Sequence, residues 1–225
     1  MTVHKRGILL GMLLGDGCLK TKTHRCLDGS VSKYYEYVIC HSTKQEAYLK
    51  YKLDLFHSII GGKRPIICYE NIKGKYESCR FSKCHKIFRL FHKTLYSKNN
   101  KKYFSDKVFR YLTPQSIALW YMDDGGLSKN SFNGKISSVE MRLYTYFSEE
   151  EADRSIRYFK DVHGINVKKR HYMKRDQWNL IFNTKECFKL EDLVKEYIIP
   201  EMQYKLPSKY FTRALDTTDC SDDIV

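Results

Sequence analysis

The chain has 225 residues, and 40 Lys and Arg against 26 Asp and Glu give it a formal net charge of +14. With 42% hydrophobic residues it can bury a full core, which excludes a disordered chain. No stretch approaches the roughly 18 apolar residues that span a membrane. We therefore expect no membrane as a partner. Net charge reports on partners rather than on fold, so the positive excess indicates a polyanion as the partner.

The first predicted element is a helix with an apolar pattern from His4 to Gly15. It ends at Gly15-Asp16-Gly17, because glycines favour helix termination. Thr43-Lys44-Gln45-Glu46 has the pattern of a capping box at the start of a second helix. The predicted elements after the first helix are strands 18–25 and 34–41, a helix from 43 to about 60, strands 65–72 and 76–82, and a helix from about 84 to 96.

The second half repeats this order. An apolar helix from Pro114 to Asp123 ends at Asp124-Gly125-Gly126, and Pro114 suits a first helical turn. Ser148-Glu149-Glu150-Glu151 is a second capping-box pattern. The predicted elements are strands up to residue 147, a helix from 148 to about 163, strands 167–174 and 177–183, and a helix from about 185 to 199.

Corresponding features of the two halves keep a slowly drifting spacing. Asp16 and Asp124 are 108 residues apart, and Thr43 and Ser148 are 105 apart. This register indicates a duplication in which each half has the order α-β-β-α-β-β-α, hence an α+β fold. We expect residues 1–103 to form the N-terminal half, residues 104–215 the C-terminal half, and the acidic tail 216–225 to be disordered.

One face of the first helix lacks side chains. Glycines recur on it at four-residue spacing, at Gly7, Gly11 and Gly15. Such a face lets another helix approach closely, and the second apolar helix carries Ala118 and Met122 at the same spacing. If these two helices pack side by side, the carboxylates of Asp16 and Asp124 meet at their ends.

Two adjacent carboxylates raise each other's pKa unless a cation lies between them. Mg²⁺ suits such a pair, because it prefers hard oxygen ligands and is commonly completed by phosphate oxygens. A single aspartate at a helix end more often caps the helix or faces solvent, but two at matching repeat positions favour metal ligands. Lys102 and Lys205, 103 residues apart, follow the last helix of each half and are the candidate active-site cations; Lys101 is the alternative to Lys102.

Two nonapeptides carry a resemblance to a known family. Leu9 to Gly17 (LLGMLLGDG) and Ile117 to Gly125 (IALWYMDDG) resemble the paired motifs of the LAGLIDADG homing endonucleases. The resemblance extends over nearly the whole chain and is closest to the monomeric, double-motif type represented by the omega-intron endonuclease. Departures from the motif occur at the helix-packing positions Leu14, Gly15 and Leu119. Segments that also resemble this type are 111–114, 120–126 and 199–207.

The resemblance implies two four-stranded antiparallel sheets that form a DNA-binding saddle, with the motif helices packed at the interface. It implies a monomeric, site-specific endonuclease that cuts both strands of a target of roughly twenty base pairs across the minor groove and leaves 3′ overhangs. Asp16, Asp124, Lys102 and Lys205 match its catalytic residues. The metal ligands would be Asp16 and Asp124 with the backbone carbonyls of Gly15 and Asp123. The cofactor would be Mg²⁺, with Mn²⁺ as a substitute and Ca²⁺ binding without cleavage.

Polar side chains that alternate with apolar ones along the predicted strands are the candidate DNA contacts, since a β-ribbon fits the major groove. Most contacts of this kind go to phosphates rather than to bases. In the first half the candidates are Lys20, Lys22, His24, Ser78, Arg80 and Ser82. In the second half they are Arg142, Lys168, Arg170, Lys174, Gln177, Asn179 and Asn183.

Two other functions fit the same sequence. An intron maturase on this fold would bind intron RNA, and both acids could persist in it unused. A catalytically silent DNA-binding protein is disfavoured, because both acids and both candidate lysines are present. The compartment stays open between a mitochondrion or chloroplast, if the gene is organellar, and a bacterial cytoplasm.

Overall fold

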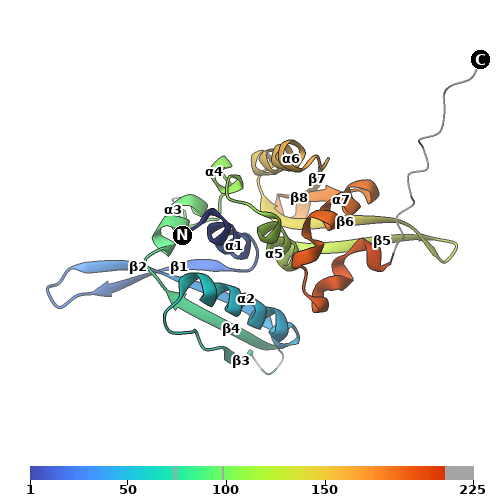
Figure 1. Cartoon of the computed structure of the whole chain (residues 1–225). Coiled ribbons are helices and arrows are strands. Elements are labelled where there is room, and N and C mark those ends of the chain that lie inside the picture. Colours follow the sequence, from blue (N-terminus) through green and yellow to red (C-terminus); the bar gives the residue numbers. More distant parts are fainter. Residues whose placement is uncertain (73, 75, 98, 211–225) are drawn as a thin grey trace, which may run out of the picture.

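The computed structural model of the protein describes residues 1–72, 74, 76–97 and 99–210. Two halves lie on either side of a central pair of helices, α1 (Val3–Leu14) and α5 (Pro114–Asp124), as Figure 1 shows. The N-terminal half continues with β1 (Cys18–Arg25), β2 (Val31–Ser42), α2 (Glu46–Ile60), β3 (Cys68–Ile72), β4 (Tyr76–Cys84) and α3 (Phe88–Leu95). The predicted acidic tail lies outside the described residues.

The C-terminal half repeats this order after the short helix α4 (Asp106–Phe109). Its elements after α5 are β5 (Gly125–Phe132), β6 (Lys135–Phe147), α6 (Glu149–His163), β7 (Lys168–Tyr172), β8 (Gln177–Phe182) and α7 (Thr184–Val194). Short 3₁₀ turns span Thr43–Gln45, Met173–Arg175, Lys195–Tyr197, Pro200–Lys205 and Pro207–Lys209.

Each half contains one antiparallel sheet of four strands. The strand orders are β1-β2-β4-β3 and β5-β6-β8-β7, so the second sheet repeats the topology of the first. This arrangement confirms the predicted α+β fold of two αββαββα halves with the motif helices between them. The exact boundary between the halves, set at residue 103, stays a prediction.

Two local predictions at helix starts in the N-terminal half were wrong. Thr43 does not open α2 with a capping box: Ser42 caps a 3₁₀ turn, and α2 begins only at Glu46 without a side-chain cap. Cys84 ends β4, so the last helix of this half starts at Phe88. The corresponding box in the C-terminal half is confirmed, because Ser148 and Glu151 exchange backbone and side-chain hydrogen bonds.

The glycine face of α1 packs directly against the start of α5 and the segment before it. A Cβ built on Gly7 would lie 2.6 Å from the carbonyl oxygen of Tyr111, and one built on Gly11 would lie 2.5 Å from that of Ser116. Real Cβ atoms do not approach so closely, so both positions require glycine. The nearest partners are therefore Tyr111 and Ser116, towards the N-terminal end of α5, rather than the predicted Ala118 and Met122.

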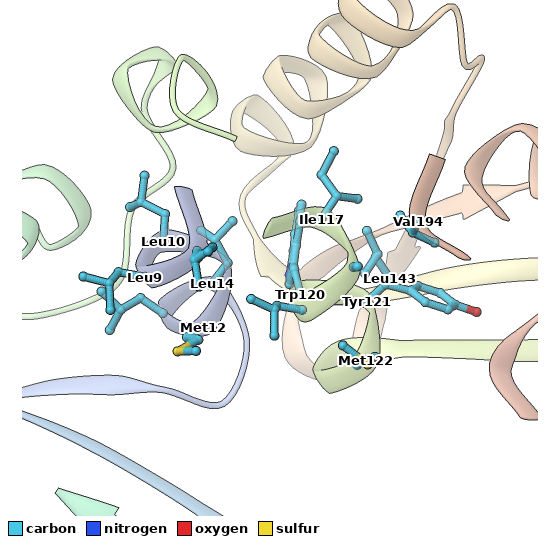
Figure 2. Packing of buried hydrophobic residues seen from close by; sticks show 14 of the residues in the cluster. Leu9, Leu10, Met12, Leu14, Ile117, Trp120, Tyr121, Met122, Leu143 and Val194 are labelled. Atoms are coloured by element: carbon cyan, nitrogen blue, oxygen red, sulfur yellow. The ribbon is translucent and has the colours of Figure 1, made fainter. Parts of the chain in front are cut away.

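Apolar side chains of both central helices form one buried layer. Figure 2 shows the α1 side chains beside those of α5, with Tyr121 pointing away from α1 towards Leu143 and Val194. The Tyr121 hydroxyl donates to the carbonyl oxygen of Lys205, 2.8 Å away. The layer holds the C-terminal ends of α1 and α5 in fixed positions. None of the described helices combines the length and apolar character that crossing a membrane requires.

Candidate active site

The two motif helices end at a shared cavity. Asp16 follows Gly15, the C-cap of α1, and Asp124 is the last residue of α5. Both carboxylates line one cavity of about 270 Å³, together with Lys102 and the aromatic rings of Phe104 and Trp120. The structure thus brings together one acid from each half, as the repeat register predicted.

The two candidate lysines bind equivalent ends of the motif helices. Lys102 Nζ donates to the carbonyl oxygen of Gly15, 2.7 Å away. Lys205 Nζ is buried and donates to the carbonyl oxygen of Met122, 2.6 Å away. Ammonium groups suit these positions because the C-terminal end of a helix carries partial negative charge. Lys101 is exposed, and it is Lys102 that lines the cavity.

The acids lie in an environment that disfavours uncompensated negative charge. Burial, followed by the nearby Asp123 and Asp16, raises the pKa of Asp124 to about 7. Burial and then Asp123 also raise the pKa of Asp16. Burial lowers the pKa of both Lys102 and Lys205, although the acids around them act in the opposite direction. Burial thus disfavours the charged form of both acids more than the nearby lysines favour it.

A buried network beside Asp16 was not predicted from the sequence. Lys52 of α2 forms an ion pair with Asp123, and both side chains are fully buried. Lys52 Nζ also lies 3.1 Å from Nε2 of His41, a buried residue near the end of β2. The backbone N–H of Asp16 donates to Asp123 Oδ2 at 3.0 Å. Burial and the neighbouring Lys52 lower the pKa of His41 to about 4, so its ring is neutral near pH 7.

The sequence contained one signal for this network. Leu49, Leu53 and Phe56 form the buried stripe of α2, and Lys52 lies within that stripe at helical spacing. A lysine on an apolar face needs a buried acid as its partner. The sequence did not indicate that the side chain of Asp123 is this partner, because only the backbone carbonyl of Asp123 was assigned a role, as a metal ligand.

The donor set fits a hard divalent cation. Asp16, Asp123 and His41 each place one ligand atom within 4.8 Å of the others, and Asp124 lines the same cavity as Asp16. Lys52 and the Asp16 N–H engage both oxygens of Asp123, and Lys52 also engages His41, so the oxygens open to a metal are those of Asp16 and Asp124. Carboxylate oxygens are the ligands that Mg²⁺ prefers. The carbonyl oxygen of Gly15, predicted as a ligand, accepts the hydrogen bond from Lys102.

The predicted DNA contacts of the N-terminal half gather in one groove on its sheet. Lys20, Lys22, Arg80 and Ser82 line a cavity of about 460 Å³. Lys63, Arg64 and Lys83, which were not predicted, line it as well. His24 is exposed towards the end of β1. Ser78 is buried and donates to the carbonyl oxygen of Glu70, so its hydroxyl serves the sheet.

The groove of the C-terminal half is different in chemistry. Gln177 and Asn179 line a cavity of about 370 Å³ that reaches Asp124. Most of its other lining residues were missed: Tyr144, Tyr146, Tyr172 and Arg175. No feature of the sequence indicated that these tyrosines lie in a groove, yet Tyr146 is 71% exposed.

The remaining predicted contacts of this half surround the groove. Arg142 and Arg170 both pair with Glu140, so one carboxylate holds two guanidinium groups on the sheet face. Lys168 and Lys174 are exposed. Asn183 caps α7 by accepting from the backbone N–H of Glu186, so its side chain is engaged in the fold.

The chain is thus a duplicated α+β protein with paired acids in one cavity between two similar halves, and each half carries a groove on its sheet. Residues 6–190 match the LAGLIDADG DNA endonuclease family, and the chain belongs to this family.

Solved structures share this fold. The homing endonuclease I-WcaI bound to its DNA recognition sequence matches with a TM-score of 0.70 and 25% identity, covering 91% of this chain and 86% of that chain. I-DmoI in complex with DNA and Mn matches with a TM-score of 0.53 and 12% identity over 85% of this chain and 96% of that chain, which shows the fold alone.

Curated relatives carry two kinds of name. The chain is 30% identical over 209 residues to Protein RecA of Mycolicibacterium chitae, which is 90% of this chain and 46% of the relative. It is 32% identical over 120 residues to the probable intron-encoded endonuclease 1 of Wickerhamomyces canadensis, covering 49% and 47% of the two chains. The chain thus spans about half the length of these relatives, so the name RecA describes more than the segment that matches.

Proposed function

We propose that the protein is a site-specific, Mg²⁺-dependent DNA endonuclease of intron homing that cuts both strands across the minor groove and leaves 3′ overhangs. The observation that carries the proposal is the cavity at the ends of α1 and α5, where each half contributes one acid, Asp16 or Asp124. Cleavage of both DNA strands needs two equivalent sets of catalytic side chains, and the duplication supplies one set from each half.

The chain's own residues have distinct roles in this reaction. Asp16 and Asp124 hold the divalent metal, which when bound activates water and neutralises charge on the phosphoryl oxygens. Lys102 and Lys205 stabilise the negative charge that develops at the scissile phosphates, since both ammonium groups are already fixed on helix-end carbonyls. The grooves of the two sheets hold the duplex on either side of the cavity.

The proposed substrate is a long asymmetric duplex bound by one chain. Two grooves with different lining residues lie on the two sheets, so the two half-sites of the target should differ in sequence. The names of I-WcaI and of the intron-encoded endonuclease of Wickerhamomyces canadensis support the same activity.

The test is cleavage of a randomised or genomic DNA library by the purified chain with Mg²⁺, followed by sequencing of the cut ends. We expect one family of related targets with short 3′ overhangs and no products in EDTA. Mn²⁺ should replace Mg²⁺, and Ca²⁺ should support binding without cleavage. Retention of intron RNA but no cleavage of any duplex would overturn the proposal in favour of a maturase.

A further inference from the structure

Lys52 is the most deeply buried cation among the described residues, and the roles proposed above do not use it. Its side chain is fully enclosed, and it extends from α2 of the N-terminal half to Asp123 of α5, which belongs to the C-terminal half. An ion pair so far from water is retained only where its geometry and hydrogen bonds are good. This pair therefore fixes one half against the other next to the acids.

Lys52 is connected to Asp16 by two routes. An ammonium group only donates, so His41 Nε2 accepts from Lys52 and the ring proton lies on Nδ1, which is 3.5 Å from Asp16 Oδ2. On the other route, Lys52 donates to Asp123 Oδ1, while Asp123 Oδ2 accepts the backbone N–H of Asp16. One ammonium thus orients both the backbone and the carboxylate of Asp16.

Up to residue 210, where the description of the C-terminal half ends, this half contains no equivalent of the Lys52 network. Lys52 is the seventh residue of the 15-residue α2, and the seventh residue of the 15-residue α6 is Ser155, whose hydroxyl donates to the carbonyl of Glu151. The residue before the motif acid is Asp123 in α5 but Gly15 after α1. A Cβ on Gly15 would overlap the Asp123 carboxylate. Lys52, Asp123 and Gly15 therefore form one complementary set, which lies beside Asp16.

We propose that Lys52 is a positioning residue that acts through Asp123 and His41 to hold Asp16 in its metal-binding geometry. The inference rests on the proposed function, because it assigns Asp16 to the metal. It also explains how three acids share one site, since the ammonium neutralises Asp123 and leaves Asp16 and Asp124 to the divalent ion.

The experiment uses Lys52→Met, which keeps most of the volume and removes the charge. Supporting groups behind metal ligands typically change metal affinity or activity by about 10–100-fold. We expect single-turnover cleavage of the selected target to slow by at least about 10-fold and the half-saturating Mg²⁺ concentration to rise by about 10-fold. Mn²⁺ titration of the protein without DNA, followed by electron paramagnetic resonance, should show the same weakening independently of cleavage, because no duplex is present to be cut.

Leu53→Ala is the matched control for lost stability, since Leu53 is the next residue of α2 and is buried in the core. It should lower Tm and leave both metal titrations unchanged. Lys52→Arg keeps the charge and the donors, so it should retain the wild-type Mg²⁺ dependence. A Lys52→Met protein that resembles Leu53→Ala, with a lower Tm and unchanged Mg²⁺ and Mn²⁺ titrations, would overturn the inference.

A double variant covers the case in which Lys52→Met fails to fold. Lys52→Met with Asp123→Asn removes both buried charges together and leaves an amide oxygen that accepts from the Asp16 N–H. We expect a folded protein that still needs about 10-fold more Mg²⁺; wild-type Mg²⁺ dependence would count against Lys52. Failure of the wild-type chain to cut any library target would instead refute the proposed function.

Discussion

The two sides of the active site share one frame and differ in what supports their acids. Asp16 is backed by Lys52, His41 and Asp123, and its carboxylate is 44% exposed. Asp124 lies in the last turn of α5, and burial raises its pKa to about 7. Duplication thus fixed the positions of the acids, whereas their electrostatic surroundings diverged.

The grooves show the same divergence. The N-terminal groove is lined by five lysines and arginines besides Lys20, whereas the C-terminal groove is lined by three tyrosines, Arg175 and two amides. Charge favours phosphate contacts that are independent of sequence, while amides and aromatic rings suit contacts with base edges. The halves should therefore divide affinity and specificity between them.

The largest expected effect comes from the paired acids. Asp16→Asn and Asp124→Asn keep the size of each side chain and remove a metal-binding charge, so each should lower double-strand cleavage by about 10³-fold or more. Binding to the target in Ca²⁺ should stay within a few-fold of wild type. Cleavage assays on the selected duplex measure the effect, and full activity of either variant would mean that its half does not supply a metal ligand.

The lysines come next in expected magnitude. Lys102→Met and Lys205→Met should each slow cleavage by roughly 10²-fold, which is typical for the loss of one preorganised group at a developing charge. Equal losses would show that the two sides are equivalent at this level despite their different supports. Gels that resolve nicked from linear product compare the two strands, and Lys101→Met, at the exposed neighbouring position, is the control.

The repeat register accounts for how much of the molecule could be predicted. Periodicity and spacing predicted the order of helices and strands in both halves and the meeting of Asp16 with Asp124, because these depend on local patterns that occur twice. The two four-stranded sheets were predicted from the family resemblance. The Thr43 capping box failed because Ser42 is engaged one residue earlier, in a 3₁₀ turn. The Lys52–Asp123 pair was missed because it joins residues of different halves, 71 positions apart, and has no repeat counterpart.

The tyrosines were missed for a different reason. Tyr144 and Tyr146 alternate with the buried Leu143, Thr145 and Phe147 of β6, so they lie on the solvent face. Alternation in the sequence places them on one face of the sheet, but aromatic residues are abundant in strands generally. Only the three-dimensional structure shows that this face borders the cavity containing Asp124.

The difference between the two acids should appear in the pH dependence of stability without metal. The folded-state pKa of Asp124, about 7, is above that of an unfolded aspartate, so the folded protein keeps a proton that the unfolded chain releases between about pH 4 and 7. The free energy of unfolding should therefore fall as the pH rises through this range, by roughly 4 kcal/mol, because a pKa difference from 3.8 to about 7 is worth about 1.4 kcal/mol per pH unit.

The buried His41, which is neutral near pH 7, changes the pH dependence of stability in the opposite direction. Its pKa is lowered to about 4, so it contributes a gain in stability as the pH rises from 4 to 6.5. The informative quantity is thus the difference between wild type and Asp124→Asn, measured by urea unfolding in EDTA at pH 5 and pH 8. The wild type should lose stability relative to the variant at pH 8, and added Mg²⁺ should restore it. If the free energy of unfolding changed equally in both proteins between pH 5 and pH 8, Asp124 would not have a raised pKa.

The smallest effect separates the two grooves. Lys22→Ala should weaken binding to all duplexes alike and lower the salt slope of the association constant by about 1, as expected when one phosphate contact is lost. Tyr146→Phe removes a hydroxyl and no charge, so it should leave the salt slope unchanged and alter only the preference among bases next to the cut. Fluorescence anisotropy in Ca²⁺ at several salt concentrations measures both. If Tyr146→Phe changed the salt slope as Lys22→Ala does, the two grooves would not divide charge and base recognition in this way.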